Sequence, residues 1–240
     1  MTLQPGSWLP DFSRREQEQP ELMDDPACDL PELHRTYAQF GAVNALVSGW
    51  PLVYRTQIRP FLQPGRANTL LDIGCGGGDV ARTLIRLAAR DGYTLRVLGI
   101  DADRRATDYA QAQPAFSGLY FRAVVSSELV REGQHFDFVT SNHVLHHLTA
   151  PELTALLHDC EALGDRTVHS DIERSALAWA GFGALTAPFF RDSFIVPDGM
   201  LSVRRSFTLP ELRRAVPPGW QVTRPFPFRL LLTYPGAGRA

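Results

Sequence analysis

From residue 69 to residue 172 the sequence alternates short apolar runs with longer amphipathic stretches, and no other feature restricts the fold as strongly. The apolar runs are typical of buried β-strands and occupy residues 69–74, 95–101, 119–125, 136–142 and 166–172. The stretches with helical spacing of apolar residues occupy residues 79–92, 103–113 and 151–163. Strands that alternate with helices specify a parallel sheet with helices on both faces, so we predict an α/β, doubly wound, Rossmann-like fold.

The C-terminal part departs from this alternation. A short helix is predicted at residues 209–216, followed by two strand-like runs, 220–226 and 228–234, with only Pro227 between them. Because so short a link cannot hold a crossover helix, we predict an antiparallel pair at the end of a mostly parallel, seven-stranded sheet. The aromatic-rich residues 173–207 precede this part, and we predict that they form an insertion near the ligand.

The N-terminal part divides into two segments of different composition. Residues 1–32 are rich in proline, glutamine and acidic residues and lack periodicity, so we predict an extended or partly disordered lead. Residues 33–64 show helical spacing, and Pro51 is placed to begin a second helix there. A cluster of turn residues at 63–68 marks a boundary, after which residues 65–240 form the predicted core domain.

The composition excludes several classes of partner and chemistry. The formal net charge is −2 with no basic stripe, which argues against nucleic acid, and no apolar run reaches the roughly 20 residues of a membrane span. All 24 basic residues are arginine, so a lysine Schiff base and a lysine-dependent phosphate loop are excluded. Three scattered cysteines, Cys28, Cys75 and Cys160, and an N-terminus without a secretory signal favour a reducing cytoplasm.

The most informative local motif is LDIGCGGGDV, residues 71–80, which links the first predicted strand to the helix after it. In doubly wound sheets, ligands bind at the carboxyl ends of strands, where a glycine-rich loop lets backbone N–H groups come close. A dinucleotide would place its pyrophosphate at the helix entry, where Asp79 would repel it. S-adenosylmethionine has no phosphate and carries a sulfonium cation, so Asp72 and Asp79 favour it. Asp101 ends the second strand, and a carboxylate there can accept hydrogen bonds from the ribose of either ligand.

Residues 70–148 resemble a class I S-adenosylmethionine-dependent methyltransferase of the small-molecule branch, which includes quinone-biosynthesis enzymes. LLDIGCGGGD resembles the first motif of that family, VLGIDAD its ribose-binding second strand, and FDFVTSNHVLHHL its fourth strand and the segment that follows. The resemblance extends more weakly to residues 166–172 and to the final strand pair. It implies that S-adenosylmethionine is the cofactor and that the helices of residues 33–64 form a lid over it.

The resemblance also implies roles for individual residues. Those expected to line the methionine part of the donor are Asp72, Gly74, Cys75 (through its backbone) and Gly76. Those expected beside the adenine are Ala102, Asp103, Val124 and Val125, the valines standing where the family often has Asp or Asn. Asp101 should hold the ribose, and Asn142 should approach the donor's amino group. Apart from the resemblance, Tyr37 on the first predicted helix stands where an aromatic residue usually packs in the core, and its ring could also stack near the sulfonium, where a cation–π contact is favourable.

Three histidines cluster in SNHVLHHL, directly after the fourth predicted strand. His143 follows the strand tip and is our first candidate for a general base, with His146 second, because an imidazole pKa near about 6.5 suits removal of a phenolic proton. His147 stands where the family commonly has histidine, so we interpret it as structural. No carboxylate lies nearby at ligand spacing, so no metal site is predicted.

Together these features predict a cytoplasmic enzyme that transfers a methyl group from S-adenosylmethionine to a small molecule. The aromatic-rich residues 177–194 favour an apolar, flat acceptor such as a phenol, quinol or polyketide-like ring, methylated on oxygen without a metal. We expect a monomer or homodimer, with no nucleic-acid partner and no stable membrane insertion. Two alternatives stay open, a nicotinamide-dependent oxidoreductase and a non-catalytic module that binds S-adenosylmethionine and acts through a partner.

Overall fold

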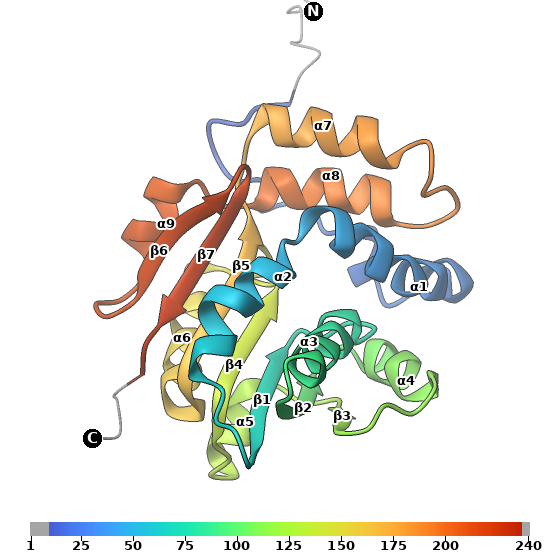
Figure 1. Cartoon of the computed structure of the whole chain (residues 1–240). Helices are drawn as coiled ribbons and strands as arrows, with labels where there is room; N and C mark the ends of the chain where they lie inside the picture. The colour runs from blue at the N-terminus through green and yellow to red at the C-terminus, as the bar shows by residue number, and fades with distance from the viewer. Residues whose placement is uncertain (1–9, 237–240) are drawn as a thin grey trace, which may run out of the picture.

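The computed structural model describes residues 10–236, in which seven strands form one sheet in the order β3-β2-β1-β4-β5-β7-β6. The strands are β1 (Ala67–Ile73), β2 (Thr94–Ile100), β3 (Leu119–Arg122), β4 (Phe136–Asn142), β5 (Gly164–Ile172), β6 (Gln221–Phe226) and β7 (Arg229–Tyr234). The pairs among β1 to β5 are parallel, whereas β7 runs antiparallel to both β5 and β6. The predicted α/β fold with an antiparallel C-terminal pair is therefore confirmed (Figure 1).

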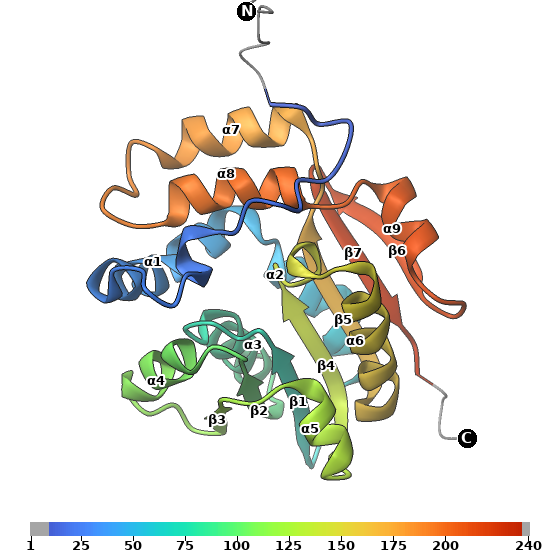
Figure 2. The ribbon, with the colours of Figure 1, turned by 180° about the vertical axis from the view of Figure 1, so that it is seen from behind.

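Helices cover both faces of the sheet, and each face has its own apolar core. The helices of residues 10–236 are η1 (Leu22–Asp24), α1 (Leu30–Val47), α2 (Trp50–Val53), η2 (Tyr54–Ile58), η3 (Arg59–Phe61), α3 (Asp79–Arg90), α4 (Arg104–Ala112), α5 (Ser126–Arg131), η4 (Leu145–His147), α6 (Ala150–Leu163), α7 (Ala176–Thr186), α8 (Ile195–Arg205) and α9 (Leu209–Ala215). On one face α2, the π-helical turn η2 and α3 pack against β1 and β2. On the other, α5, α6 and α9 cover the sheet (Figures 1 and 2).

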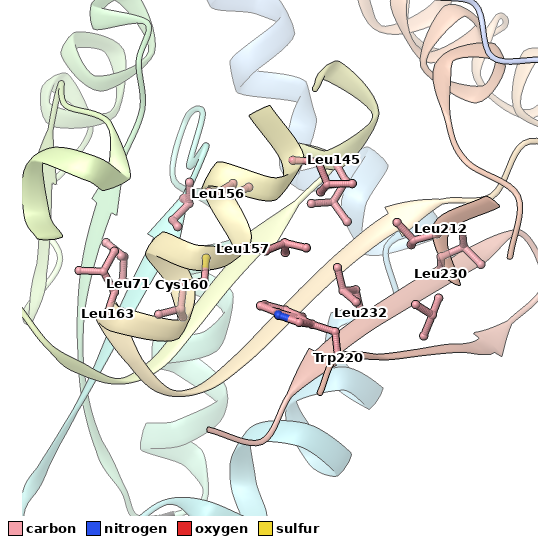
Figure 3. Close-up of a cluster of buried hydrophobic side chains, with 14 of the residues drawn as sticks. Leu71, Leu145, Leu156, Leu157, Cys160, Leu163, Leu212, Trp220, Leu230 and Leu232 are labelled. Carbon is pink, nitrogen blue, oxygen red and sulfur yellow. The ribbon is translucent and has the colours of Figure 1, made fainter. Parts of the chain in front are cut away.

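The core beneath α6 shows why this segment forms a helix. Its buried residues recur at the spacing of one helical face and are Leu153, Leu156, Leu157, Cys160 and Leu163. Thr149 and Glu152 form a capping box at its start. Figure 3 shows Leu157 and Cys160 facing the sheet, with Leu232 of β7 and Trp220 beside them. Burial of each such leucine stabilises the fold by roughly 1.5–3 kcal/mol, so α6 fixes the position of β4 and β5.

Three helices lie beyond the carboxyl ends of the parallel strands. These are α1, α7 and α8, of which α7 and α8 occupy the predicted insertion 173–207 (Figures 1 and 2). β3 ends at Arg122 rather than at residue 125, so residues 124 and 125 belong to the loop that leads into α5. No helix within residues 10–236 combines the length and hydrophobicity that a bilayer span requires.

Residues 10–29 run across α8 as an irregular segment interrupted by η1 (Figure 2). Asp198 of α8 accepts hydrogen bonds from the backbone N–H of Leu22 at 2.8 Å and of Met23 at 2.9 Å. This contact carries Glu21 into the interior, where only 3% of the residue stays exposed. The rest of the predicted lead, residues 1–9, lies outside the described residues.

Candidate active site

A large cavity of about 1400 Å³ opens at the carboxyl edge of the sheet. Its lining includes every residue that the sequence predicted for the site, namely Tyr37, Asp72, Gly74, Cys75, Gly76, Asp101, Ala102, Asp103, Val124, Val125, Asn142, His143 and His146. The glycine-rich loop, α1 and the end of β2 line one part of it, and α7, α8 and η4 line another. The fold therefore brings together residues from well-separated parts of the sequence.

The glycine loop adopts backbone angles that side chains disfavour. Gly74 has φ +65°, and a Cβ there would lie 2.4 Å from Val144 Cγ2. Gly76 has φ +51°, but a Cβ there would come no closer than 3.9 Å to Phe40. Gly74 is thus needed for packing, whereas the backbone at Gly76 faces open space that a ligand can approach.

Asp101 ties the end of β2 to this loop. Its two carboxylate oxygens accept hydrogen bonds from the backbone N–H of Gly76 and of Asp103, both at 2.9 Å. Burial raises the pKa of Asp101, and these two donors partly offset that effect. Each oxygen keeps a free lone pair, so the carboxylate can still accept from ligand hydroxyls.

Two more buried carboxylates stand beside Asp101. Asp72 accepts from Thr140 Oγ1 at 3.1 Å, and burial raises its pKa to about 7. Asp79, at the start of α3, accepts from Asn44 Nδ2 at 2.8 Å, and burial raises its pKa as well. Within residues 10–236, no basic side chain forms an ion pair with any of these three acids. The cavity therefore holds three carboxylates that no basic side chain of the described residues balances.

The remaining predicted donor residues surround this group. Tyr37 of α1 is buried over the loop, with its Cβ 3.3 Å from where a Cβ at Gly77 would lie. The Cys75 thiol is buried, which raises its pKa well above the usual range. Asp103 caps α4 through the Arg105 N–H and also pairs with the Arg105 guanidinium. Val125 is 44% exposed and, together with Val124 and Ala102, forms an open, apolar rim.

Asn142 has its amide already engaged. Its Oδ1 accepts from Arg229 Nη2 at 3.0 Å, and its Nδ2 donates to Asn44 Oδ1 at 3.3 Å. The amide thus joins α1 to β4 and β7. Its carbonyl oxygen keeps a second lone pair, so the predicted contact of Asn142 with the donor's amino group stays a prediction.

His143 is the first residue after β4 and has φ +60°, a backbone conformation that is uncommon outside glycine. Its N–H donates to the Ser170 carbonyl at 3.0 Å. Its Nε2 accepts a hydrogen bond from Arg229 Nη1. Burial and the Arg229 charge hold the pKa of His143 well below its usual range, so the imidazole is neutral at pH 7.

His146 lies in a different electrostatic environment. Its Nδ1 is 2.7 Å from Asp171 Oδ1, and its Nε2 is 3.5 Å from Glu21 Oε1. Burial alone would lower the pKa of His146, but the Asp171 and Glu21 carboxylates outweigh burial and raise it to about 9. The two candidate bases therefore differ, because His143 is neutral at pH 7 and His146 is protonated.

Four residues of this site were missed by the sequence analysis. They are Glu21, Asn44, Asp171 and Arg229. Glu21 lies 125 positions before His146 and was assigned to an irregular lead, so sequence spacing gives no sign of their contact. Asp171 and Arg229 lie on strands that the sequence predicted. Which residues their side chains contact depends on the register between β5 and β7, which the sequence did not predict.

Comparison with known proteins agrees with this geometry. Residues 70–163 match a family model described as a methyltransferase domain. The chain is 31% identical over 116 residues to the ubiquinone biosynthesis O-methyltransferase of Klebsiella pneumoniae, covering 46% of this chain and 45% of that protein. It is 36% identical over 88 residues to the ubiquinone biosynthesis O-methyltransferase of Sinorhizobium fredii, and this match covers 36% of this chain and 33% of that protein. The chain thus spans less than half the length of the curated relatives it matches.

A solved structure shares the fold over nearly the whole chain. The plantazolicin methyltransferase BpumL, in complex with S-adenosylhomocysteine (SAH), superposes with a TM-score of 0.56 at 14% identity, covering 88% of this chain and 90% of that one. At this identity the likeness concerns the fold, which includes the segments outside residues 70–163.

Proposed function

We propose that this chain is a class I S-adenosylmethionine-dependent methyltransferase of the small-molecule type and that it methylates an oxygen of a small, apolar acceptor. The S–CH₃ bond of the donor breaks as the O–CH₃ bond forms, and S-adenosylhomocysteine leaves. The donor methyl is already activated, so the protein contributes chiefly by holding donor and acceptor in line.

The observation that carries this proposal is the group of three buried acids without a protein cation. S-adenosylmethionine brings an ammonium and a sulfonium, which would favour the ionised forms of Asp72, Asp79 and Asp101. A dinucleotide would instead bring a pyrophosphate into the same field, where like charges repel. The acids thus support a methyl donor and disfavour a nicotinamide cofactor.

On the donor side, the proposed roles follow from the contacts. Asp101 would accept hydrogen bonds from the ribose hydroxyls, and the open backbone at Gly76 would lie beneath the methionine part. The apolar rim of Val124, Val125 and Ala102 would hold the adenine. Tyr37 would lie over the loop, near the sulfonium.

The acceptor side is apolar with a few polar groups. Side chains of α7 and α8 that line the cavity are Leu177, Phe182, Leu185, Ile195 and Val203. This lining suits an apolar, aromatic acceptor. The two relatives from Klebsiella pneumoniae and Sinorhizobium fredii are named for O-methylation in ubiquinone biosynthesis, which supports an oxygen acceptor of this type.

We assign proton removal to His143, because its imidazole is neutral at pH 7, as a general base has to be, although burial and Arg229 lower its pKa and make it a weaker base than a free imidazole. Arg229 occupies its Nε2 in the ligand-free cavity. An acceptor hydroxyl that enters between the two groups would give its proton to His143 and leave its oxygen beside the Arg229 guanidinium. That charge would then stabilise the oxyanion until it attacks the methyl group.

The donor assignment is tested by replacing the ribose-binding acid. Asp101→Ala removes two hydrogen bonds to a charged acceptor, each worth roughly 1.5–3 kcal/mol, so we expect SAH to bind at least about tenfold more weakly by calorimetry. Asp108→Ala, an exposed substitution on α4, is the matched control and should leave affinity unchanged. An unaltered dissociation constant in Asp101→Ala would refute the ribose assignment, and NADH binding to the wild type would refute the cofactor.

The base assignment is tested with His143→Asn, since asparagine tolerates the positive φ of this position. We expect turnover of a phenolic acceptor to fall about 10²–10⁴-fold while SAH affinity stays nearly constant. The loss should shrink at high pH, where the acceptor ionises without a base. If His143→Asn keeps full turnover, proton removal lies elsewhere, and the same measurement on His146→Asn shows whether that residue performs it.

The proposed setting is the cytoplasm, with a small molecule as acceptor and the protein a monomer or homodimer. All three cysteines are free thiols, and two of them, Cys75 and Cys160, are buried. Unpaired cysteines of this kind are typical of a reducing compartment.

A further inference from the structure

We propose that Glu21, His146 and His147 bind one divalent first-row transition ion of the zinc type, on the acceptor side of the cavity. One ligand atom from each residue lies within 4.8 Å of the others. Two imidazoles and one carboxylate are the donor set of open zinc sites, in which a further position is left for water or substrate. The proposal differs from the expectation of a metal-free site, because the carboxylate comes from a segment far away in the sequence.

The two rings converge on the two oxygens of one carboxylate. His146 Nε2 lies 3.5 Å from Glu21 Oε1, and His147 Nε2 lies 3.8 Å from Glu21 Oε2. Ligand atoms about 2.0–2.2 Å from a shared tetrahedral ion lie about 3–3.5 Å from one another, so only small shifts are needed. Each ring therefore presents the nitrogen that could bind an ion toward the same point.

The opposite nitrogen of each ring faces another carboxylate. His146 Nδ1 lies 2.7 Å from Asp171 Oδ1, and His147 Nδ1 lies 3.4 Å from Asp24 Oδ2. An ion that binds His146 would displace the proton from its Nε2, and the carboxylate on Nδ1 would then fix the tautomer that presents Nε2 to the ion and make the imidazole a better ligand. Both histidines therefore have one carboxylate near Nδ1 and share Glu21 near Nε2. A buried ion pair between one histidine and one acid would not require the second histidine to be arranged in the same way.

One of the ligand atoms lacks a hydrogen bond. His146 Nε2 is buried and has no hydrogen-bond partner among the described residues, although it is aimed at Glu21. A buried polar atom without a partner is uncommon and costs stability, so it calls for an explanation. An ion between His146 and Glu21 would satisfy it.

The ligands are held in place and the site can be reached. Ser202 Oγ donates to Glu21 Oε1 at 2.7 Å, and the His146 N–H donates to Asp171 Oδ2 at 3.0 Å. The His147 side chain is 29% exposed, and all three proposed ligands line the cavity. Nitrogen ligands favour zinc-type ions over magnesium or calcium, which prefer oxygen alone. If the proposed methyl transfer holds, the open position would receive an oxygen of the acceptor.

The test uses the full chain without an affinity tag, stripped with a chelator and titrated with Zn²⁺ by calorimetry. Co²⁺ serves as a second probe, read by its visible absorption. We expect one equivalent of Zn²⁺, and an affinity at least about tenfold weaker in Glu21→Gln and in His147→Gln. The matched controls are Glu18→Gln and His158→Gln, both exposed, which should bind Zn²⁺ as the wild type does.

The proposal is overturned if the wild type binds less than one equivalent, or if the two ligand variants bind Zn²⁺ as tightly as the controls. Should the buried Glu21→Gln fail to fold, the partly exposed His147→Gln gives the same comparison. SAH titration of the same samples without metal reports on the donor site alone. A failure of the metal site can therefore be told apart from a failure of the proposed methyl transfer.

Discussion

Asp72 illustrates how the donor half of the cavity destabilises the ligand-free protein. The residue is 2% exposed, and among residues 10–236 its only hydrogen-bond donor is the Thr140 hydroxyl, so burial raises its pKa from 3.8 to about 7. An acid whose folded pKa lies above its unfolded pKa binds more protons when folded. Stability is therefore lost as pH rises from about 4 to about 7, and the full penalty is present above pH 7.

Asp72→Asn should consequently raise the melting temperature, and by more at pH 8 than at pH 5. A shift from 3.8 to about 7 sets an upper limit of about 4 kcal/mol on the gain at pH 8. The same substitution should weaken SAH binding, because the donor loses a carboxylate. Exposed Asp108→Asn is the control for both measurements. A gain that is equal at the two pH values would mean that Asp72 is ionised without penalty.

The location of a site residue could be predicted from the sequence where the residue stands next to a predicted strand. The glycines of residues 74–78, and the acids that flank them, stand next to a predicted strand, so their place at the carboxyl edge follows from the fold class. The state of His143 did not follow, because it depends on Arg229, which reaches it from β7. A contact between residues 86 positions apart has no signature in the spacing of either segment.

At the scale of elements, residues 33–64 contain two kinds of helix. Residues 50–61 belong to the core, since Trp50, Tyr54 and Ile58 are fully or almost fully buried against the sheet face. α1 instead lies over the cavity and packs on α3, α4 and α8. Its contacts with the site run through Tyr37 and through Asn44, which joins Asp79 to Asn142.

We therefore predict that ligand-dependent closure is confined to α1. On addition of SAH, amide hydrogen exchange should slow over residues 33–47, because lids that sequester a reaction close over bound ligand. Within residues 50–61, the amides of Trp50, Tyr54 and Ile58 should be strongly protected with and without ligand, since these residues are buried against the sheet and do not line the cavity. Equal protection of α1 in both states would contradict a lid, and a ligand effect that spans 50–61 as well would place the moving unit differently.

The elements predicted from the sequence agree with the structure at β4 and differ from it at β3, α7 and α8. β4 was predicted at residues 136–142 as it is found, and Phe136, Phe138 and Val139 supply its buried apolar side chains. β3 is shorter than predicted, since Val124 and Val125 extend the apolar run into a loop at the cavity rim. The sequence predicted an insertion at residues 173–207 but not the two helices α7 and α8 within it. α7 is apolar on all sides, so its sequence shows no periodic apolar face that would indicate a helix.

At the scale of the whole molecule, the cavity is complete only when the N-terminal segment lies on α8. Residues 10–29 are fastened there by Asp198, by an Arg204–Glu16 ion pair, and by Arg15, whose guanidinium donates to the His146 carbonyl at 2.9 Å. No sequence pattern predicts this path, because the segment has no periodicity and its contacts with α8 are with residues more than 170 positions away. It nevertheless supplies Glu21 to the acceptor half.

Asp198→Ala should therefore separate the two halves of the cavity. Loss of the two hydrogen bonds that the carboxylate accepts from backbone N–H groups, each worth roughly 1.5–3 kcal/mol, should loosen residues 10–29 and speed their hydrogen exchange and proteolysis. SAH affinity should change by less than about threefold, because the proposed donor contacts come from α1 and from the ends of β1 and β2. Turnover of a phenolic acceptor and binding of Zn²⁺ should both fall at least about tenfold, because both depend on the position of the lead beside His146.

Asp108→Ala is again the control. If Asp198→Ala loses SAH affinity in parallel with turnover, residues 10–29 support the donor half of the cavity as well.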